Sequence, residues 1–442
     1  MEENLNKELL DFIAESPTAW HAVETLARCL REAGYREIFE EERWALQPGE
    51  RCFVRRNGSS LIAFRVPEGR PAGFMLMAAH ADSPSFRIKE LETVGAAGLY
   101  AQLNVERYGG MLMASWLDRP LSVAGRVVVR DGERLAVRLV DLRRDVAMIP
   151  NLAIHMDRGQ NEGKNYDPKT DLLPLIGSEA NGPRFRALVA EAAGTTKEDL
   201  VSAELQLYPR MAGTVWGVEE EFVSAPRLDD LQCVFACAQG FLQAKPSESV
   251  PVLVVFDNEE VGSSTRQGAG AGFLADTLAR AAESLGIGSD EYRSLLARSF
   301  LVSADNAHAV HPNHPEYADR VDRPKLNGGV VIKANANQRY TTDAVSAAVF
   351  SELCCRAGVP TQRYTNRADL PGGSTLGNIS LSQVAVRSVD IGLPQLAMHS
   401  CYETAGAKDT AFLVRAAAHF FSSTLAVQKE SFALLDGKES EA

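Results

Sequence analysis

The chain has 442 residues and a formal net charge of −12, with no basic run, which excludes nucleic acid or an anionic membrane as its main partner. Its 45% hydrophobic and 24% charged fractions are those of a soluble globular protein, and its length predicts two domains. We see no signal peptide and no apolar run long enough to span a bilayer. The seven scattered cysteines form no C-x-x-C pair, which predicts reduced thiols and a cytoplasmic protein.

The N-terminal part is expected to hold two helices within residues 5–33 and a pair of strands within residues 52–66. A buried apolar run then ends in His80-Ala-Asp82. Strand alternation puts both polar side chains on the same side, where a carboxylate can take the second N–H of a metal-bound imidazole. For so short a motif, a structural, hydrogen-bonded histidine is at least as good an interpretation.

The sequence pattern of residues 89–223 differs from that of the flanking segments. It contains short β-like segments around the turn at Asp131-Gly132 and no strand that ends in carboxylates. We interpret them as an inserted β-rich domain. The surrounding α/β domain is then formed by residues 1–88 and 224–442. His155 follows an apolar segment of the insertion, and the residues alone favour a core or interface histidine there.

The α/β texture resumes before Asp229-Asp230, directly ahead of a helix that is predicted to begin at Leu231. An aspartate in this place is commonly the N-cap of its helix. The alternative is a functional carboxylate that bridges two metal ions. The residues alone leave both possibilities open.

A second buried strand, Pro251–Phe256, ends in Asp257-Asn258-Glu259-Glu260. Three carboxylates within four residues repel one another unless a cation lies among them. In open α/β sheets, ligands bind beyond the carboxyl ends of the strands, which is where this cluster falls. We therefore expect one or two metal ions here, with a solvated acidic loop as the alternative.

Two later segments follow the same plan. An apolar strand from Ser299 ends at Asp305, and His399 precedes a helix predicted over residues 409–425. The tail after Ala426 is expected to be polar and frayed.

Taken together, strand ends and helix starts supply a set of nitrogen and oxygen donors: His80, Asp229, Glu259 or Glu260, Asp305 and His399. Such a set suits zinc, cobalt or manganese. One carboxylate shared by two ions about 3.5–4 Å apart is typical of aminopeptidases and other two-metal hydrolases.

Six motifs extend this pattern along the chain: H-A-D-S-P at His80, P-R-L-D-D at Asp229, D-N-E-E-V-G-S at Asp257, S-A-D-N-A-H at Asp305, N-Q-R-Y at Asn337 and P-Q-L-A-M-H-S at His399. In this combination the chain resembles the aspartyl aminopeptidase family, metallopeptidase family 18, over essentially its whole length. The resemblance implies an α/β fold: a three-layer catalytic domain like that of the zinc exopeptidases, with an inserted β-rich dimerisation domain.

The resemblance also implies the chemistry. Two Zn²⁺ ions per subunit, replaceable by Co²⁺ or Mn²⁺, would be held by His80, Asp229, Glu260, Asp305 and His399, with Asp229 bridging. Glu259 falls on the catalytic acid/base position and Asp82 on that of the partner of His80. His155 matches a histidine that the family inserts into a neighbouring subunit's active site, and a homo-oligomer, in this family a dodecamer, is implied. The activity would be release of N-terminal amino acids from peptides with a free N-terminus.

Substrate contacts are expected from a short list of residues: Asn337, Arg339, Tyr340, Gly373 and Met398. Acid-selective relatives carry a lysine where this chain has Asn337, so a preference for Asp or Glu would need another cation, such as Arg339 or Lys333. A related two-metal exopeptidase or deacylase and an inactive assembly scaffold are the alternatives. The second glutamate, Glu259, argues against the scaffold.

Overall fold

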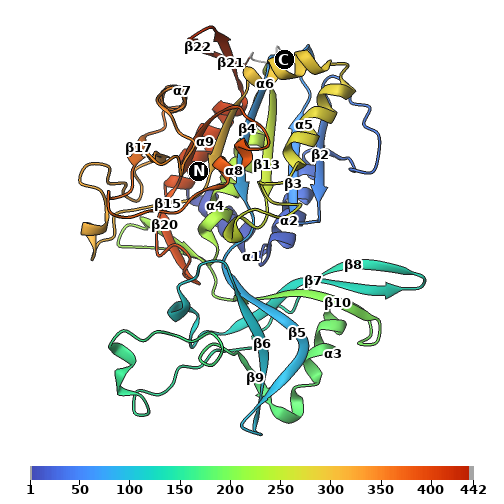
Figure 1. Ribbon diagram of the computed structural model, residues 1–442, viewed down its shortest axis with the longest axis vertical. Helices are drawn as coiled ribbons and strands as arrows, with labels where there is room; N and C mark the ends of the chain where they lie inside the picture. Colours follow the sequence, from blue (N-terminus) through green and yellow to red (C-terminus); the bar gives the residue numbers. More distant parts are fainter. Residues whose placement is uncertain (1, 438–442) are drawn as a thin grey trace.

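The computed structural model describes residues 2–437 and has a nine-stranded mixed sheet at its centre (Figure 1). The strands lie in the order β1 (Arg36–Glu37), β2 (Arg51–Arg56), β3 (Ser60–Arg65), β13 (Val250–Phe256), β4 (Phe74–His80), β14 (Phe300–Ala304), β18 (Arg387–Gly392), β16 (Val330–Lys333) and β17 (Thr361–Tyr364). The strand pair predicted within residues 52–66 lies in this sheet as β2 and β3, and the apolar runs that precede His80, Asp257 and Asp305 lie in it as β4, β13 and β14.

Alternate residues of the central strands build two separate cores, one on each face of the sheet. Met75 and Met77 of β4 enter one core, whereas Phe74 and Leu76 enter the other. The first core is covered by α1 (Glu2–Ala14), α2 (Ala19–Glu32), α4 (Leu228–Gln243), α7 (Ala344–Arg356) and α9 (Asp409–Phe421), and the second by α5 (Phe273–Ser284), α6 (Ser289–Ala297) and α8 (Leu376–Leu381). The result is a three-layer α/β arrangement.

The register of three neighbouring strands decides where the polar side chains gather. β13, β4 and β14 are mutually parallel, and Phe256 pairs with His80. Parallel strands end at the same edge of a sheet, so the residues that follow each strand emerge side by side.

Residues 85–209 form a second sheet of six strands below the first in Figure 1, in the order β8 (Arg134–Asp141), β7 (Leu121–Asp131), β10 (Leu200–Pro209), β5 (Ser85–Ala96), β6 (Tyr100–Tyr108) and β9 (Leu175–Ser178). One face packs against α3 (Arg184–Ala192) around its own core, which includes Phe86, Trp116 and Phe185. The β7–β8 hairpin turns at Asp131-Gly132 as predicted.

A third, five-stranded sheet contains β11 (Thr214–Trp216), β12 (Phe222–Ala225), β20 (Glu403–Gly406), β19 (Pro394–Leu396) and β15 (Ala307–His308). The prediction of a frayed tail after Ala426 is wrong for the part of it that is described. β21 (Ser423–Gln428) and β22 (Ser431–Asp436) form a hairpin that buries Leu425 and Leu434 against the first core. Within residues 2–437, no helix is both long enough and apolar enough to cross a membrane.

Candidate metal centre and active site

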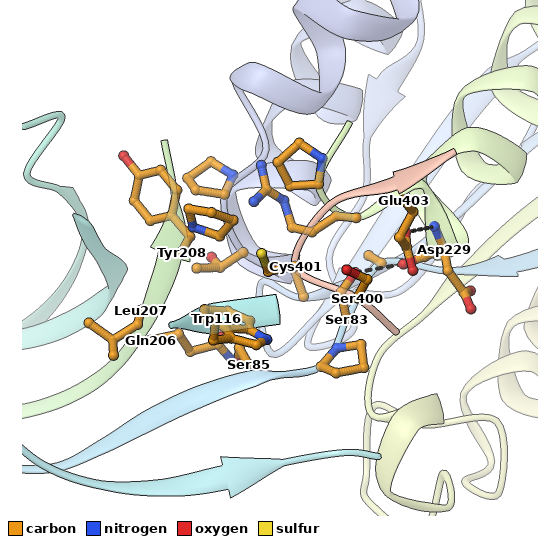
Figure 2. Close-up of a pocket in the computed structure, with 18 residues that line it drawn as sticks. Ser83, Ser85, Trp116, Gln206, Leu207, Tyr208, Asp229, Ser400, Cys401 and Glu403 are labelled. Atoms are coloured by element: carbon orange, nitrogen blue, oxygen red, sulfur yellow. Dashed lines mark hydrogen bonds between the residues drawn. The ribbon is translucent and has the colours of Figure 1, made fainter. Parts of the chain in front are cut away.

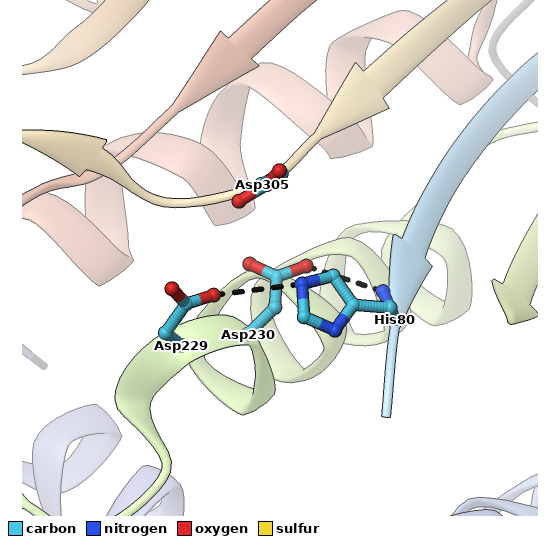
Figure 3. A group of neighbouring side chains, drawn as sticks. All are labelled: His80, Asp229, Asp230 and Asp305. Atoms are coloured by element: carbon cyan, nitrogen blue, oxygen red, sulfur yellow. Dashed lines mark hydrogen bonds and ion pairs between the residues drawn. The ribbon is translucent and has the colours of Figure 1, made fainter. Parts of the chain in front are cut away.

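Four acidic and imidazole side chains converge at the edge where the parallel strands end (Figure 3). His80 closes β4, Asp305 follows β14, and Asp229 with Asp230 opens α4. Each of the four offers one donor atom within 4.8 Å of the others, and all four residues are buried. The arrangement arises from strand register, because β4 and β14 are adjacent and parallel.

The two aspartates at the start of α4 have different roles. Asp230 accepts hydrogen bonds from the backbone N–H groups of His80 and Asn306, at 3.2 Å each, so it ties together the ends of β4 and β14. Asp229 Oδ1 lies 3.5 Å from His80 Nε2 but accepts no hydrogen bond among the described residues. A helix cap would accept an N–H group from the first turn of the helix. The backbone N–H groups that Asp230 accepts come instead from β4 and from the residue after Asp305, and Asp229 Oδ1 accepts none, so the described hydrogen bonds do not support the capping alternative.

A second group of donors shares Asp229. His399 Nε2 lies 3.5 Å from Asp229 Oδ2 and 3.4 Å from Glu260 Oε2. These three residues again offer donor atoms within 4.8 Å of one another. Asp229 thus belongs to both groups, with one oxygen directed to each.

Glu259 and Asp82 lie beside the donors. The Asp82 carboxylate accepts the backbone N–H groups of Glu259 and Glu260 at 3.1 Å each, and His80 Nδ1 lies 3.4 Å from Asp82 Oδ1. Glu259 lines the same cleft as His80, and burial raises the pKa of its carboxyl to about 7. A carboxyl group poised near neutrality suits proton transfer.

Glu403 is a buried carboxylate that the sequence did not single out. One of its oxygens accepts the N–H of Asp229 at 2.9 Å and the other accepts the N–H of His399 at 2.7 Å. The contact with Asp229 is visible in Figure 2, where β20 brings Glu403 to the start of α4. Its only sequence signal is an acidic residue four positions after His399, which is too common a pattern to be informative.

A cleft opens onto both donor groups. Its lining includes Tyr340, Gly373 and Met398, three of the residues expected to contact substrate. Asn337 and Arg339 are exposed and absent from that lining; Asn337 instead lines a neighbouring groove. The structure therefore does not bring these two residues to the donors.

The cation that does line the cleft is Lys333, at the end of β16. Its side chain is 3% exposed, and Nζ donates to the carbonyl oxygens of Asp305 and Asn306 at 2.8 and 3.3 Å. Burial alone would lower the pKa of Lys333, but Asp305 and other nearby acidic groups outweigh that effect and raise it, so the ammonium stays charged.

His155 is not among the residues that line the cleft. It lies on an exposed loop of the 85–209 segment. The same loop exposes three apolar side chains, Leu152, Ile154 and Met156, the last 77% exposed. Within one subunit, the described structure does not bring His155 to the other site residues.

The donor set fits zinc by its chemistry and by its unused atoms. Asp229 Oδ1 and Glu260 Oε1 are buried oxygens without a hydrogen bond in the described part of the chain. Buried polar atoms are normally satisfied, so such atoms point to a missing cationic partner. Imidazole nitrogen and carboxylate oxygen are both zinc ligands.

Comparison with known proteins identifies the family of the chain. Residues 12–421 match the sequence pattern of a protein family that is described as aminopeptidase I zinc metalloprotease (M18). A probable M18 family aminopeptidase 2 from Clostridium acetobutylicum is 43% identical over 424 residues, which cover 94% of this chain and 98% of that protein. Among solved structures, Ape4 in a complex with Nbr1 is 37% identical, with a TM-score of 0.90 and coverage of 95% of this chain and 86% of that one. The mApe1 dodecamer of S. cerevisiae is 28% identical, with a TM-score of 0.84 and coverage of 95% and 98%.

Fold and site together define a metallo-aminopeptidase with a mixed α/β architecture. More particularly, the chain belongs to the M18 family of zinc metalloproteases, which confirms the resemblance found in the sequence.

Proposed function

We propose that the chain is a two-zinc aminopeptidase with His80, Asp229 and Asp305 around one ion and Asp229, Glu260 and His399 around the other. One observation carries this proposal: Asp229 belongs to both donor groups and directs a different oxygen to each. A carboxylate shared in this way is the hallmark of two-metal hydrolases.

The residues around the donors have separable tasks in peptide hydrolysis. Zinc held by these donors would supply Lewis-acid chemistry, lowering the pKa of a water molecule and polarising the scissile carbonyl. Glu259 takes the proton of the attacking water and returns it to the leaving amine. Asp82 holds the second nitrogen of His80 and the backbone of the glutamate pair, which fixes the geometry of donors and base.

Lys333 supports a preference for acidic N-terminal residues. A carboxylate in the cleft needs a buried cationic partner, and Lys333 lines the cleft whereas Asn337 and Arg339 do not. An ammonium has three N–H donors, and two of those of Lys333 are directed to backbone carbonyls. The third makes no hydrogen bond within the described residues, although Asp305 Oδ2 lies 3.8 Å from Nζ, and we assign this third N–H to the substrate's side-chain carboxylate.

A panel of aminoacyl chromogenic substrates tests activity and specificity together. It should contain Asp, Glu, Leu, Lys and Arg derivatives and their N-acetylated forms, assayed with zinc, cobalt and manganese. We expect release from Asp or Glu and none from acetylated substrates. Lys333→Met should lower kcat/KM for Asp about tenfold or more relative to Leu, the loss expected for an unpaired buried charge. Asn337→Ala and Arg339→Gln are the matched controls and should leave the ratio unchanged.

An outcome in which Asn337→Ala changes the ratio and Lys333→Met does not would reverse this assignment. Hydrolysis of acetylated substrates alone would favour a deacylase. Absence of turnover with any metal, despite two bound ions, would favour a scaffold.

We further propose assembly of subunits through the segment that contains residues 89–223, up to a dodecamer, with His155 completing a neighbouring subunit's cleft. The exposed apolar side chains beside His155 suit burial against another subunit. We also propose a cytoplasmic location, because all seven cysteines are free thiols and the cytoplasm keeps thiols reduced.

A further inference from the structure

One strand of the second sheet ends directly against the metal centre. Tyr108 is the last residue of β6 and is 7% exposed, and the chain then passes along two donors. Leu112 donates its N–H to the carbonyl oxygen of His399 at 3.0 Å. A Cβ atom placed on Gly110 would lie 3.8 Å from His399 Nδ1. Residues 108–112 therefore form a wall of the site, although they belong to the sheet of residues 85–209.

Tyr108 closes a ring of hydrogen bonds around the glutamate pair. Its hydroxyl donates to Asp82 Oδ2 at 2.7 Å and accepts from Asn258 Nδ2 at 2.8 Å. Asp82 in turn accepts the N–H groups of Glu259 and Glu260. The phenol thus holds both the carboxylate that orients His80 and the residue that precedes Glu259. Closed, fully satisfied networks of this kind fix the positions of their members.

Gly109 brings the backbone of the second sheet into close contact with Glu260. Its φ of +73° lies in the left-handed region, and an added Cβ would lie 3.1 Å from Glu260 Cβ and 3.4 Å from the Glu260 carbonyl oxygen. Glycine allows both this backbone angle and the close approach. The backbone of the second sheet therefore packs directly on a residue of the second donor group.

We propose that Tyr108 and Gly109 are positioning residues, through which the second sheet sets the geometry of Glu259, Glu260 and His80 in the first. The inference rests on the proposed function for the roles of those three residues. It gives the second sheet a part in the chemistry of its own subunit, in addition to any part in assembly.

Tyr108→Phe tests the hydrogen-bonded contact, with zinc affinity in chelator competition as the primary measurement and kcat as the second. Loss of an outer partner of a metal ligand costs about 10-fold to 100-fold in affinity or activity. Tyr108 contacts Asp82, the outer partner of His80, so we expect the lower end of that range, about 10-fold, for zinc affinity and kcat, with little change in KM. Tyr208→Phe is the matched control. Tyr208 lies on β10 of the same sheet (Figure 2) and donates to Asp141 at 2.6 Å. It is not among the residues that line the cleft.

Gly109→Ala tests the steric contact without removing a hydrogen bond. Gly98→Ala is its control, because Gly98 lies in the β5–β6 turn with φ +66° and open space around its Cβ position. We expect weaker zinc binding in Gly109→Ala only, while thermal melting and circular dichroism verify folding of all four variants.

Wild-type zinc affinity in both Tyr108→Phe and Gly109→Ala would overturn the proposal, and so would an equal loss in Tyr208→Phe. Failure of the proposed function looks different. The unmodified protein would then release no amino acid from any substrate, while Tyr108→Phe would still bind zinc more weakly than Tyr208→Phe.

Discussion

Glu403 shows how one residue can serve two metal ligands without contacting a metal. It is 1% exposed, and its two oxygens hold the backbone N–H groups of Asp229 and His399, which come from the start of α4 and from the loop after β19. Asp229 is the residue common to both donor groups. By holding both Asp229 and His399, the Glu403 carboxylate therefore fixes the placement of the two groups relative to each other.

The first prediction at this scale concerns Glu403→Gln. The amide of glutamine can accept only one of the two N–H groups, so one ligand must shift. We expect zinc affinity to fall about 10-fold to 100-fold. Asp409→Asn is the matched control, since Asp409 is also fully buried and accepts two backbone N–H groups, from Asn327 and Gly329. It should lower the free energy of unfolding by about 1–3 kcal/mol and leave zinc affinity unchanged. Equal zinc loss in both variants would mean that Glu403 acts through general stability.

The second prediction concerns Glu259→Gln. Glutamine keeps the size of the side chain but cannot accept the proton of water, so kcat should fall by at least about 100-fold. The bound-zinc stoichiometry, measured by mass spectrometry of the metal content, should stay that of the unmodified protein, because Glu259 lies in neither donor group. Unchanged turnover with full metal content would remove Glu259 from the mechanism.

At the scale of elements, α2 predicts a pH dependence of stability. Burial lowers the pKa of His21 to about 4, and Thr18 Oγ1 lies 2.8 Å from its Nδ1. The unfolded chain protonates this histidine below about pH 6.5, whereas the folded chain keeps it neutral down to about pH 4. Between these values the unfolded state binds more protons, so stability falls as the pH falls.

Replacement by asparagine removes this titration. We expect His21→Asn to lose less stability than the unmodified protein between about pH 7 and about pH 5, by up to about 2 kcal/mol in urea unfolding. Parallel slopes for His21→Asn and the unmodified protein would contradict the assignment.

The sequence predicted those elements whose signals are local. β4, β13 and β14 are continuous apolar runs, and parallel pairing alone brings their polar ends together, so His80 and Asp305 could be placed before the structure was known. Glu403 and Tyr108 could not, because each reaches the site through contacts with distant parts of the chain. The β21–β22 hairpin was missed because its turn, Lys429-Glu430, carries no glycine, asparagine or aspartate signal.

At the scale of the whole molecule, the proposal that His155 completes a neighbouring subunit's cleft can be tested directly. His155→Ala should lower kcat with zinc content unchanged, and His314→Ala should have no effect. The decisive experiment mixes subunits: His155→Ala and Glu259→Gln are each impaired alone, but co-assembled they should regain activity. A site with an intact Glu259 can then receive an intact His155 from its neighbour. Activity no higher than the mean of the two separate variants would show that His155 acts within its own subunit or not at all.

The donors of the metal centre are also widely separated along the chain, from His80 at the end of β4 to His399 after β19. No fragment that ends before His399 contains the full set, and the set forms only when the β13–β4–β14 register and the α4 start are both in place. Metal binding to such a site is coupled to folding. A chain still under synthesis therefore lacks part of the donor set until β18 and β19 have been made and His399 has been added.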